Sequence, residues 1–148
     1  MAHVYSNPNP HNSLVGDCVV RALSLALDIP WSEVYLGLCV QGLVLGDMPS
    51  SNRVWGEFLK EHGYIRKKVP DECPYCYTIR DFCEEHSEGT YIVCTGTHVV
   101  CCKDGNYMDT WDSGDETVLF YWEARNEQYL LDVARNDAKS DGFINKKV

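Results

Sequence analysis

Cys18 is the residue of this sequence best placed to act as a nucleophile. The apolar residues that follow it, among them Val19, Ala22 and Leu23, have helical spacing, and Asp17 is suited to an N-cap. A helix N-terminus carries partial positive charge, which lowers the pKa of a thiol and favours the reactive thiolate. The backbone N–H of Cys18 could also form half of an oxyanion hole. The alternative is a cysteine that only packs within the helix.

His98 and Asp109 are the candidates for a base and for the residue that orients it. The dipeptide Asp104-Gly105 between two apolar runs is a strong signal for a two-residue hairpin turn. Such a turn pairs His98 with Trp111, and residues two apart along a strand share a face of the sheet. We therefore expect Asp109 to lie on the same face as His98, one diagonal away.

Asp112 is the alternative third residue. It falls on the opposite face from His98 unless a bulge intervenes. Without catalysis, His98 would be a structural strand residue and Asp109 a solvent-facing residue of the sheet. The joint geometry favours a functional pair, because a nucleophilic cysteine needs a base and the base needs an orienting partner.

The order of predicted elements is helices first and strands second. Residues 1–16 and the stretches 40–50 and 70–77 are typical of coil and loops. Helical spacing predicts helices from Cys18 through Leu27, from Pro30 through Leu38, from a cap at Ser50 or Ser51 to Gly63, and from Thr78 to about His86. Strands are predicted over Tyr64–Val69, Tyr91–Cys94, His98–Cys102, Tyr107–Trp111 and Val118–Trp122. This order indicates an α+β fold, with N-terminal helices packed on a C-terminal antiparallel sheet. We expect one domain over residues 1–134 and a polar tail over 135–148.

The sequence resembles a small, minimal member of the papain-like cysteine peptidase superfamily. In that family a nucleophilic Cys begins a helix in the first half of the chain. A His begins a strand in the second half, and an Asn or Asp follows on the next strand. The resemblance implies that Cys18 is the nucleophile, that His98 is the general base and acid, and that Asp109 orients His98.

Two further positions carry the resemblance. Members of the family have a Gln six residues before the Cys, and Asn12 occupies that position here. The resemblance thus implies that the Asn12 amide completes the oxyanion hole. In the family a small polar residue and a Trp often follow the third member, and this Trp covers the pair. Asp109-Thr110-Trp111 matches that pattern.

These residues predict a thiol hydrolase, either a cysteine peptidase or an amidase. It would cleave a peptide, isopeptide or amide bond through an acyl-enzyme on Cys18, without a cofactor, and its partner would be a protein or peptide substrate. An acyltransferase with the same Cys18 and His98 is an alternative, because both reactions share the acyl-enzyme. A non-catalytic protein-binding module on the same fold is another.

The binding module could be stabilised by zinc. Cys73 and Cys76 form a C-x2-C pair, and Cys83 and His86 follow it in the sequence. These four side chains would suit a tetrahedral zinc site. Against this, Cys83 lies on the apolar face of its predicted helix and is as well suited to the core.

Composition narrows the remaining possibilities. The 148 residues are 45% hydrophobic and 24% charged, which suits one globular domain. A formal charge of −9 disfavours a nucleic-acid partner. The eight cysteines would suggest disulfides in a secreted chain, but the first residues resemble no export signal and no apolar run suits a membrane span. We therefore expect a cytoplasmic protein with reduced cysteines.

Overall fold

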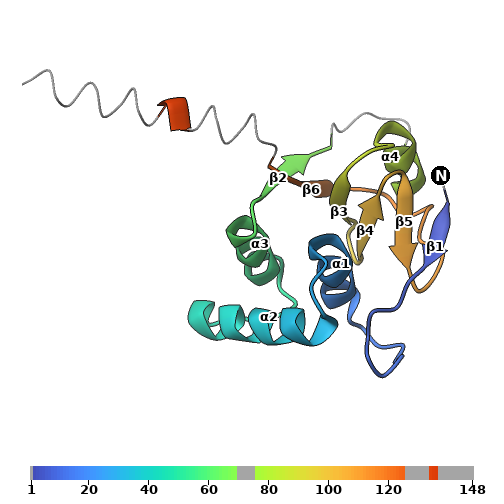
Figure 1. Ribbon diagram of the computed structural model, residues 1–148. Coiled ribbons are helices and arrows are strands. Elements are labelled where there is room, and N and C mark those ends of the chain that lie inside the picture. The colour runs from blue at the N-terminus through green and yellow to red at the C-terminus, as the bar shows by residue number, and fades with distance from the viewer. Residues whose placement is uncertain (1, 70–75, 126–133, 137–148) are drawn as a thin grey trace, which may run out of the picture.

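A mixed, six-stranded sheet forms the centre of the fold (Figure 1). The computed structural model describes residues 2–69, 76–125 and 134–136. The strands of the sheet are β1 (His3–Tyr5), β2 (Tyr64–Lys68), β3 (Thr90–Cys94), β4 (Val99–Lys103), β5 (Asn106–Asp109) and β6 (Phe120–Ala124). Their order across the sheet is β1-β5-β4-β3-β6-β2, and β1 pairs with β5 in parallel while the other pairs are antiparallel.

Helices cover both faces of this sheet. The helices packed on the sheet are α1 (Cys18–Leu27), α2 (Trp31–Leu45), α3 (Asn52–Glu61) and α4 (Ile79–Glu85), and residues 134–136 form a separate helical turn. Figure 1 shows α1 against the sheet, with α2 and α3 beyond it, and α4 apart from these three. The expected α+β class is therefore confirmed.

Two hydrophobic clusters hold these layers together. The larger one joins α1, α2 and α3 to the sheet through buried residues that include Leu23, Trp55 and Ile92. The smaller one places Phe82 of α4 against the opposite face, where Val93 is buried. Ile92 and Val93 are neighbours in β3, so the alternation of a strand sends their side chains into different clusters.

The β4–β5 hairpin has the register predicted from its turn. Lys103 pairs with Asn106, and Asp104 and Gly105 have φ angles of 49° and 78°. Two successive positive φ values are the requirement of the hairpin turn that Asp-Gly favours. This register brings the end of β5, with Asp109, beside the start of β4.

The structure corrects two expectations about the elements. The segment 1–16 contains β1, whose parallel pairing with β5 makes the sheet mixed rather than antiparallel. The helix expected to end at Leu38 continues to Leu45, and Gly42 lies inside it. A Cβ atom on Gly42 would lie 2.6 Å from the Asp47 carbonyl oxygen, so this glycine permits a close approach of the chain rather than a loop.

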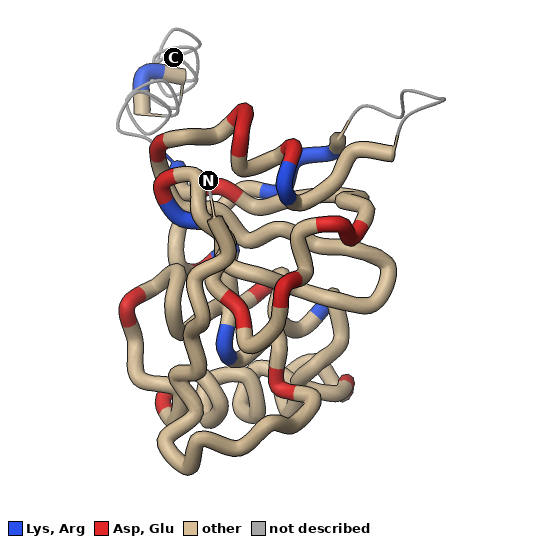
Figure 2. The backbone as a smooth tube through the Cα atoms, turned by 90° about the vertical axis from the view of Figure 1, so that its right-hand side faces the viewer, with Lys and Arg blue, Asp and Glu red and all other residues tan. Residues whose placement is uncertain are grey.

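The surface charge and the hydropathy of the helices were compared with the expectations from the sequence. Acidic positions are scattered over the face seen in Figure 2, and the described basic residues there form no continuous stripe. No single helix in the described ranges has the length and apolar character to span a membrane; α1 and α2, bent by 115°, pass such a test only as a pair. The expected tail at 135–148 lies almost entirely outside the described residues.

Candidate active site

The first turn of α1 carries Cys18, as its sequence pattern predicts. Asp17 occupies the N-cap position, but its side chain makes no capping hydrogen bond. Its carboxylate instead accepts from the indole Nε1 of Trp31 at 3.0 Å and contacts Arg21. The first-turn N–H groups of α1 are therefore not used by the Asp17 side chain, and Cys18 is partly exposed at this helix end.

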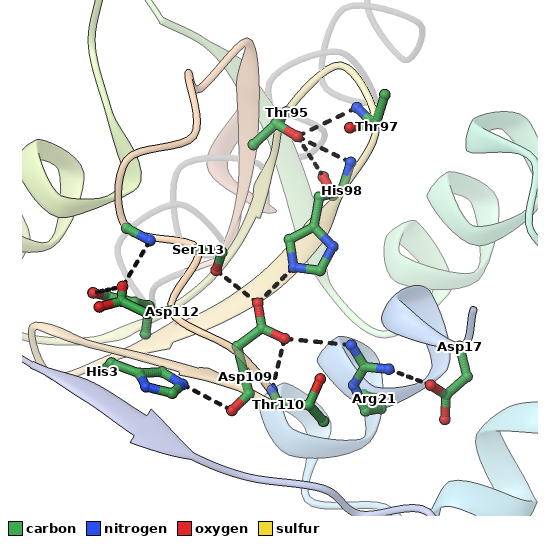
Figure 3. Close-up of polar contacts among 12 residues, drawn as sticks. His3, Asp17, Arg21, Thr95, Thr97, His98, Asp109, Thr110, Asp112 and Ser113 are labelled. Atoms are coloured by element: carbon green, nitrogen blue, oxygen red, sulfur yellow. Dashed lines mark hydrogen bonds and ion pairs between the residues drawn. The ribbon is translucent and has the colours of Figure 1, made fainter. Parts of the chain in front are cut away.

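His98 is fixed by the turn between β3 and β4. Its backbone N–H donates to the Thr95 hydroxyl oxygen at 2.9 Å, and its carbonyl accepts from the Thr95 N–H at 2.8 Å. The Thr97 N–H also donates to the Thr95 hydroxyl, at 3.3 Å. These bonds hold the backbone on both sides of the imidazole, which points toward Asp109 (Figure 3). The side chain of His98 therefore has a defined origin and direction.

Asp109, at the end of β5, is the carboxylate that meets His98. Its Oδ2 lies 2.5 Å from Nε2 of His98 and accepts from the Ser113 hydroxyl at 2.6 Å. Its Oδ1 accepts from the Thr110 N–H at 2.8 Å and from Nη2 of Arg21 at 3.3 Å. Asp109 is 2% exposed, and both of its oxygens are held (Figure 3). Such a carboxylate fixes the tautomer and the orientation of its histidine.

The Asp109 carboxyl stays ionised despite its burial. Burial raises its pKa, but hydrogen bonds from His98 and Ser113 oppose this effect and leave the pKa below its ordinary value. A buried negative charge therefore lies beside the imidazole and favours its protonated form.

Cys18 and His98 lie together at one wall of the cavity and shift each other's pKa. Because Nε2 of His98 faces Asp109, Nδ1 is the ring nitrogen left for the sulfur. Burial raises the pKa of Cys18, but hydrogen bonds from His98 and from the Val99 N–H, together with the nearby positive charges, bring the pKa below its ordinary value. For His98, burial lowers the pKa, but the bonds to Asp109 and Cys18 dominate and raise the pKa to about 9. The two shifts favour a thiolate beside an imidazolium.

Trp111 packs against the imidazole of His98. Its ring centroid lies 5.0 Å from that of His98, with the planes tilted by 50°, while the indole remains 44% exposed. The Trp predicted from Asp109-Thr110-Trp111 to lie over the site therefore contacts His98. An apolar ring in this position limits the access of water to the hydrogen bond beneath it.

A cavity of about 650 Å³ opens beside Cys18 and His98. The turn 94–99 lines one side of it, and α2 contributes Trp31, Tyr35 and Leu38 to another. The rings of Trp31 and Tyr35 stack at a centroid distance of 5.1 Å. A largely apolar cavity with a few polar groups is the usual form of a small-ligand or substrate-binding site.

The structure does not bring Asn12 to this site. Asn12 is exposed, has a φ angle of 52°, and is not among the residues that line the cavity. The chain turns there, because the Asn12 N–H donates to the Asn9 carbonyl at 2.9 Å. This turn directs Asn9 inward instead: it is 5% exposed, and its amide donates to Asp17 at 3.3 Å. The expected role of Asn12 as oxyanion donor is therefore not supported by its position.

Asp112 has different partners from Asp109. Its carboxylate accepts from the Tyr107 hydroxyl at 2.5 Å and lies 3.6 Å from Nη2 of Arg80. It has no contact with His98 among the described interactions. Of the two aspartates left open by the sequence, Asp109 is the one that contacts His98.

The four residues of the possible zinc set have separate environments, so far as they are described. Cys73 lies outside the described residues, and Cys76 is exposed. Cys83 is 1% exposed and shares a hydrogen bond with Cys102, which lowers the pKa of Cys83, while Nδ1 of His86 lies 2.9 Å from the Phe82 carbonyl oxygen. Within the described part of the chain, no group of three or more His, Cys, Asp or Glu side chains is arranged to hold a metal ion.

Arg21 and Ser113 contact Asp109, although the sequence did not predict them as residues of the site. The spacing of Asp17 and Arg21, four residues apart at the start of a predicted helix, is a recognisable ion-pair signal. Ser113 offers no such signal, because it reaches Asp109 only through the turn after β5.

Comparison with known proteins adds no relative to this picture. No protein-family model, curated protein or solved structure matches the chain, so its function is inferred from the site alone.

Proposed function

We propose that this protein is a papain-like thiol hydrolase that cleaves a peptide, isopeptide or amide bond through an acyl-enzyme on Cys18. The observation that supports it best is the position of Cys18 beside His98, whose imidazole is hydrogen-bonded to the buried Asp109, at the wall of a cavity. A nucleophile, a base and an orienting carboxylate in this order are the working parts of covalent acyl transfer.

The first half of the reaction forms the acyl-enzyme. The Cys18 thiolate attacks the carbonyl carbon, an S–C bond forms, and the carbonyl electron pair moves to oxygen. The backbone N–H of Cys18, at the positive end of α1, is the donor we assign to that oxygen. The His98 imidazolium gives its proton to the leaving nitrogen, and the C–N bond breaks to leave a thioester.

The second half restores the enzyme. Neutral His98 takes a proton from water, and the resulting hydroxide attacks the thioester carbon. The C–S bond breaks, the acid leaves, and the thiolate and the imidazolium are regenerated. The hydrogen bond with Asp109 keeps the ring oriented through both proton transfers.

The surroundings of the pair support a peptide or protein substrate. The apolar wall formed by Trp31, Tyr35 and Leu38 suits an apolar or aromatic side chain next to the carbonyl that is attacked. The scattered acidic positions in Figure 2 are poorly suited to a phosphate backbone.

A peptidyl vinyl sulfone with an aromatic side chain tests the proposal. Its vinyl carbon forms a stable bond with an attacking thiolate, and digestion followed by mass spectrometry locates the adduct. We expect adduct at Cys18, and its near-complete loss in His98→Gln. If iodoacetamide modifies Cys18 but the peptide reagent does not, the thiol is accessible without a substrate site, and the proposal is wrong.

Hydrolysis and transfer separate in a second step of the same experiment. Denatured casein is supplied as substrate, with and without hydroxylamine as an acceptor amine. Free carboxyl products in water alone support a hydrolase, whereas products that form only with the amine indicate an acyltransferase. Cys18→Ser is the control for both outcomes.

A further inference from the structure

Arg21 is a buried arginine whose place in the site is not explained by the nucleophile, base and carboxylate alone. It is 6% exposed, and its guanidinium lies between the carboxylates of Asp17 and Asp109 (Figure 3). Nη1 contacts Oδ1 of Asp17 and donates to the Val15 carbonyl at 3.4 Å, and Nη2 donates to Oδ1 of Asp109 at 3.3 Å. One guanidinium nitrogen therefore contacts the start of α1, and the other contacts the end of β5.

These contacts join the two halves of the site. Asp17 and Arg21 belong to the start of α1, which carries Cys18, whereas Asp109 ends β5 and holds His98. The residues are far apart in sequence, and the guanidinium is a direct polar link between them. A shift of α1 relative to β5 would change the distance between the sulfur and the imidazole.

We propose that Arg21 is a positioning residue, which sets the alignment of Cys18 with His98 by clamping the first turn of α1 to Asp109. This inference rests on the proposed thiol chemistry. Arg21 acts on the reacting atoms only through Asp109 and through the helix. Arg21 also bonds Oδ1 of Asp109 while His98 bonds Oδ2, so both oxygens of this carboxylate contact a positively charged group.

The planar guanidinium is the reason that an arginine serves here. It presents several N–H donors in fixed directions, and it can therefore span two carboxylates and a carbonyl at once. The ammonium of a lysine is a compact charge on a flexible chain and lacks this fork. Arg21→Lys thus keeps the positive charge while it removes the clamp.

Arg80 offers a matched control on the surface. Its Nη2 also bridges two carboxylates, at 3.4 Å from Asp115 and 3.6 Å from Asp112, but its side chain is 42% exposed. Arg80→Lys makes the same chemical change at a two-carboxylate bridge away from Cys18. Circular dichroism and thermal unfolding establish that each variant is folded.

The test is the pH profile of Cys18 alkylation by iodoacetamide, measured by peptide mass spectrometry in the full chain. We expect Arg21→Lys to slow alkylation at pH 6 by roughly tenfold or more, since small misplacements in such sites can cost up to about a hundredfold. Its acid limb should move to higher pH, while Arg80→Lys matches the wild type. If folded Arg21→Lys also matches the wild type, the inference is wrong.

A second measurement uses the unmodified chain and does not depend on the folding of a variant. Arg21 and His98 share one carboxylate, so loss of the imidazolium proton should move the Arg21 guanidinium resonances with the same midpoint as the His98 ring resonances in an NMR titration. Guanidinium resonances that stay constant through the His98 titration would contradict the link. Failure of the wild type to show selective Cys18 alkylation would instead count against the thiol chemistry itself.

Discussion

Nε2 of His98 lies 2.5 Å from Oδ2 of Asp109, both side chains are buried, and the indole of Trp111 packs against the imidazole. A short, shielded contact between an imidazole and a carboxylate holds the ring in one orientation and stabilises its charged form. The other ring nitrogen is then available to Cys18.

Asp109 and Asp112 should differ sharply when each is replaced. Asp109→Asn keeps the shape but removes the charge that stabilises the His98 imidazolium, so we expect kcat to fall by about 10²–10⁴-fold. Asp112→Asn changes a carboxylate that contacts Tyr107 and Arg80, and it should leave kcat within about twofold. Steady-state kinetics with casein, or with a peptide that contains the cleaved casein site, would measure kcat for both variants. Equal losses in the two variants would contradict the assignment of Asp109.

The pH dependence of stability should reveal the raised pKa of His98. The pKa of His98 is 6.5 in the unfolded chain and about 9 in the folded chain. Between these two pH values the folded chain keeps a proton that the unfolded chain releases. This stabilisation is complete below pH 6.5 and is lost as the pH rises through about 9. The lowered pKa of Cys18 has the opposite sign and offsets it in the wild type.

Cys18→Ser removes this offset together with the part of the His98 shift that Cys18 causes, so the part due to Asp109 becomes visible. Its free energy of unfolding should fall as the pH rises above 6.5, and Cys18→Ser/His98→Gln should lack that fall. Denaturant unfolding at several pH values measures both. Parallel curves for the single and the double variant would show that His98 does not hold a proton as described.

Tyr35 should contribute to substrate binding without affecting the thiol. Tyr35 lines the cavity, whereas the adjacent Leu36 is 63% exposed and does not line it. Tyr35→Ala removes an aromatic wall, so we expect kcat/KM for an apolar substrate to fall by roughly tenfold, the scale of such pocket contacts. The small reagent iodoacetamide should modify Cys18 at an unchanged rate. The matched Leu36→Ala variant should change neither quantity, and a similar loss in it would rule out a specific role for the cavity.

The predictions from sequence succeeded where the signals are local. The turn Asp104-Gly105 fixes the register of β4 and β5, and the strand alternation then places Asp109 beside His98. The start of α1 at Cys18 follows equally from apolar spacing over ten residues. Such signals depend on neighbours in the chain and on backbone geometry, which a sequence displays directly.

The predictions from sequence failed where contacts between distant parts of the chain determine the local structure. β1 has three residues and exists because β5 offers a parallel edge, so it leaves no periodic pattern of its own. α2 continues past Leu38 through residues that are apolar on every side, including exposed Val40 and Leu43, and therefore show no amphipathic stripe. Asn12 has the expected offset from Cys18, but the intervening chain turns and directs it outward.

Iodoacetamide alkylation of Cys18, followed from pH 5 to pH 9 and compared with Cys39 in the same molecules, tests the central claim most directly. Cys39 is a partly exposed free thiol that serves as the internal reference. The proposed ion pair predicts that Cys18 reacts faster than Cys39 at pH 6, and that His98→Gln abolishes this advantage. Equal rates for the two thiols at pH 6, or an advantage that persists in His98→Gln, would contradict it.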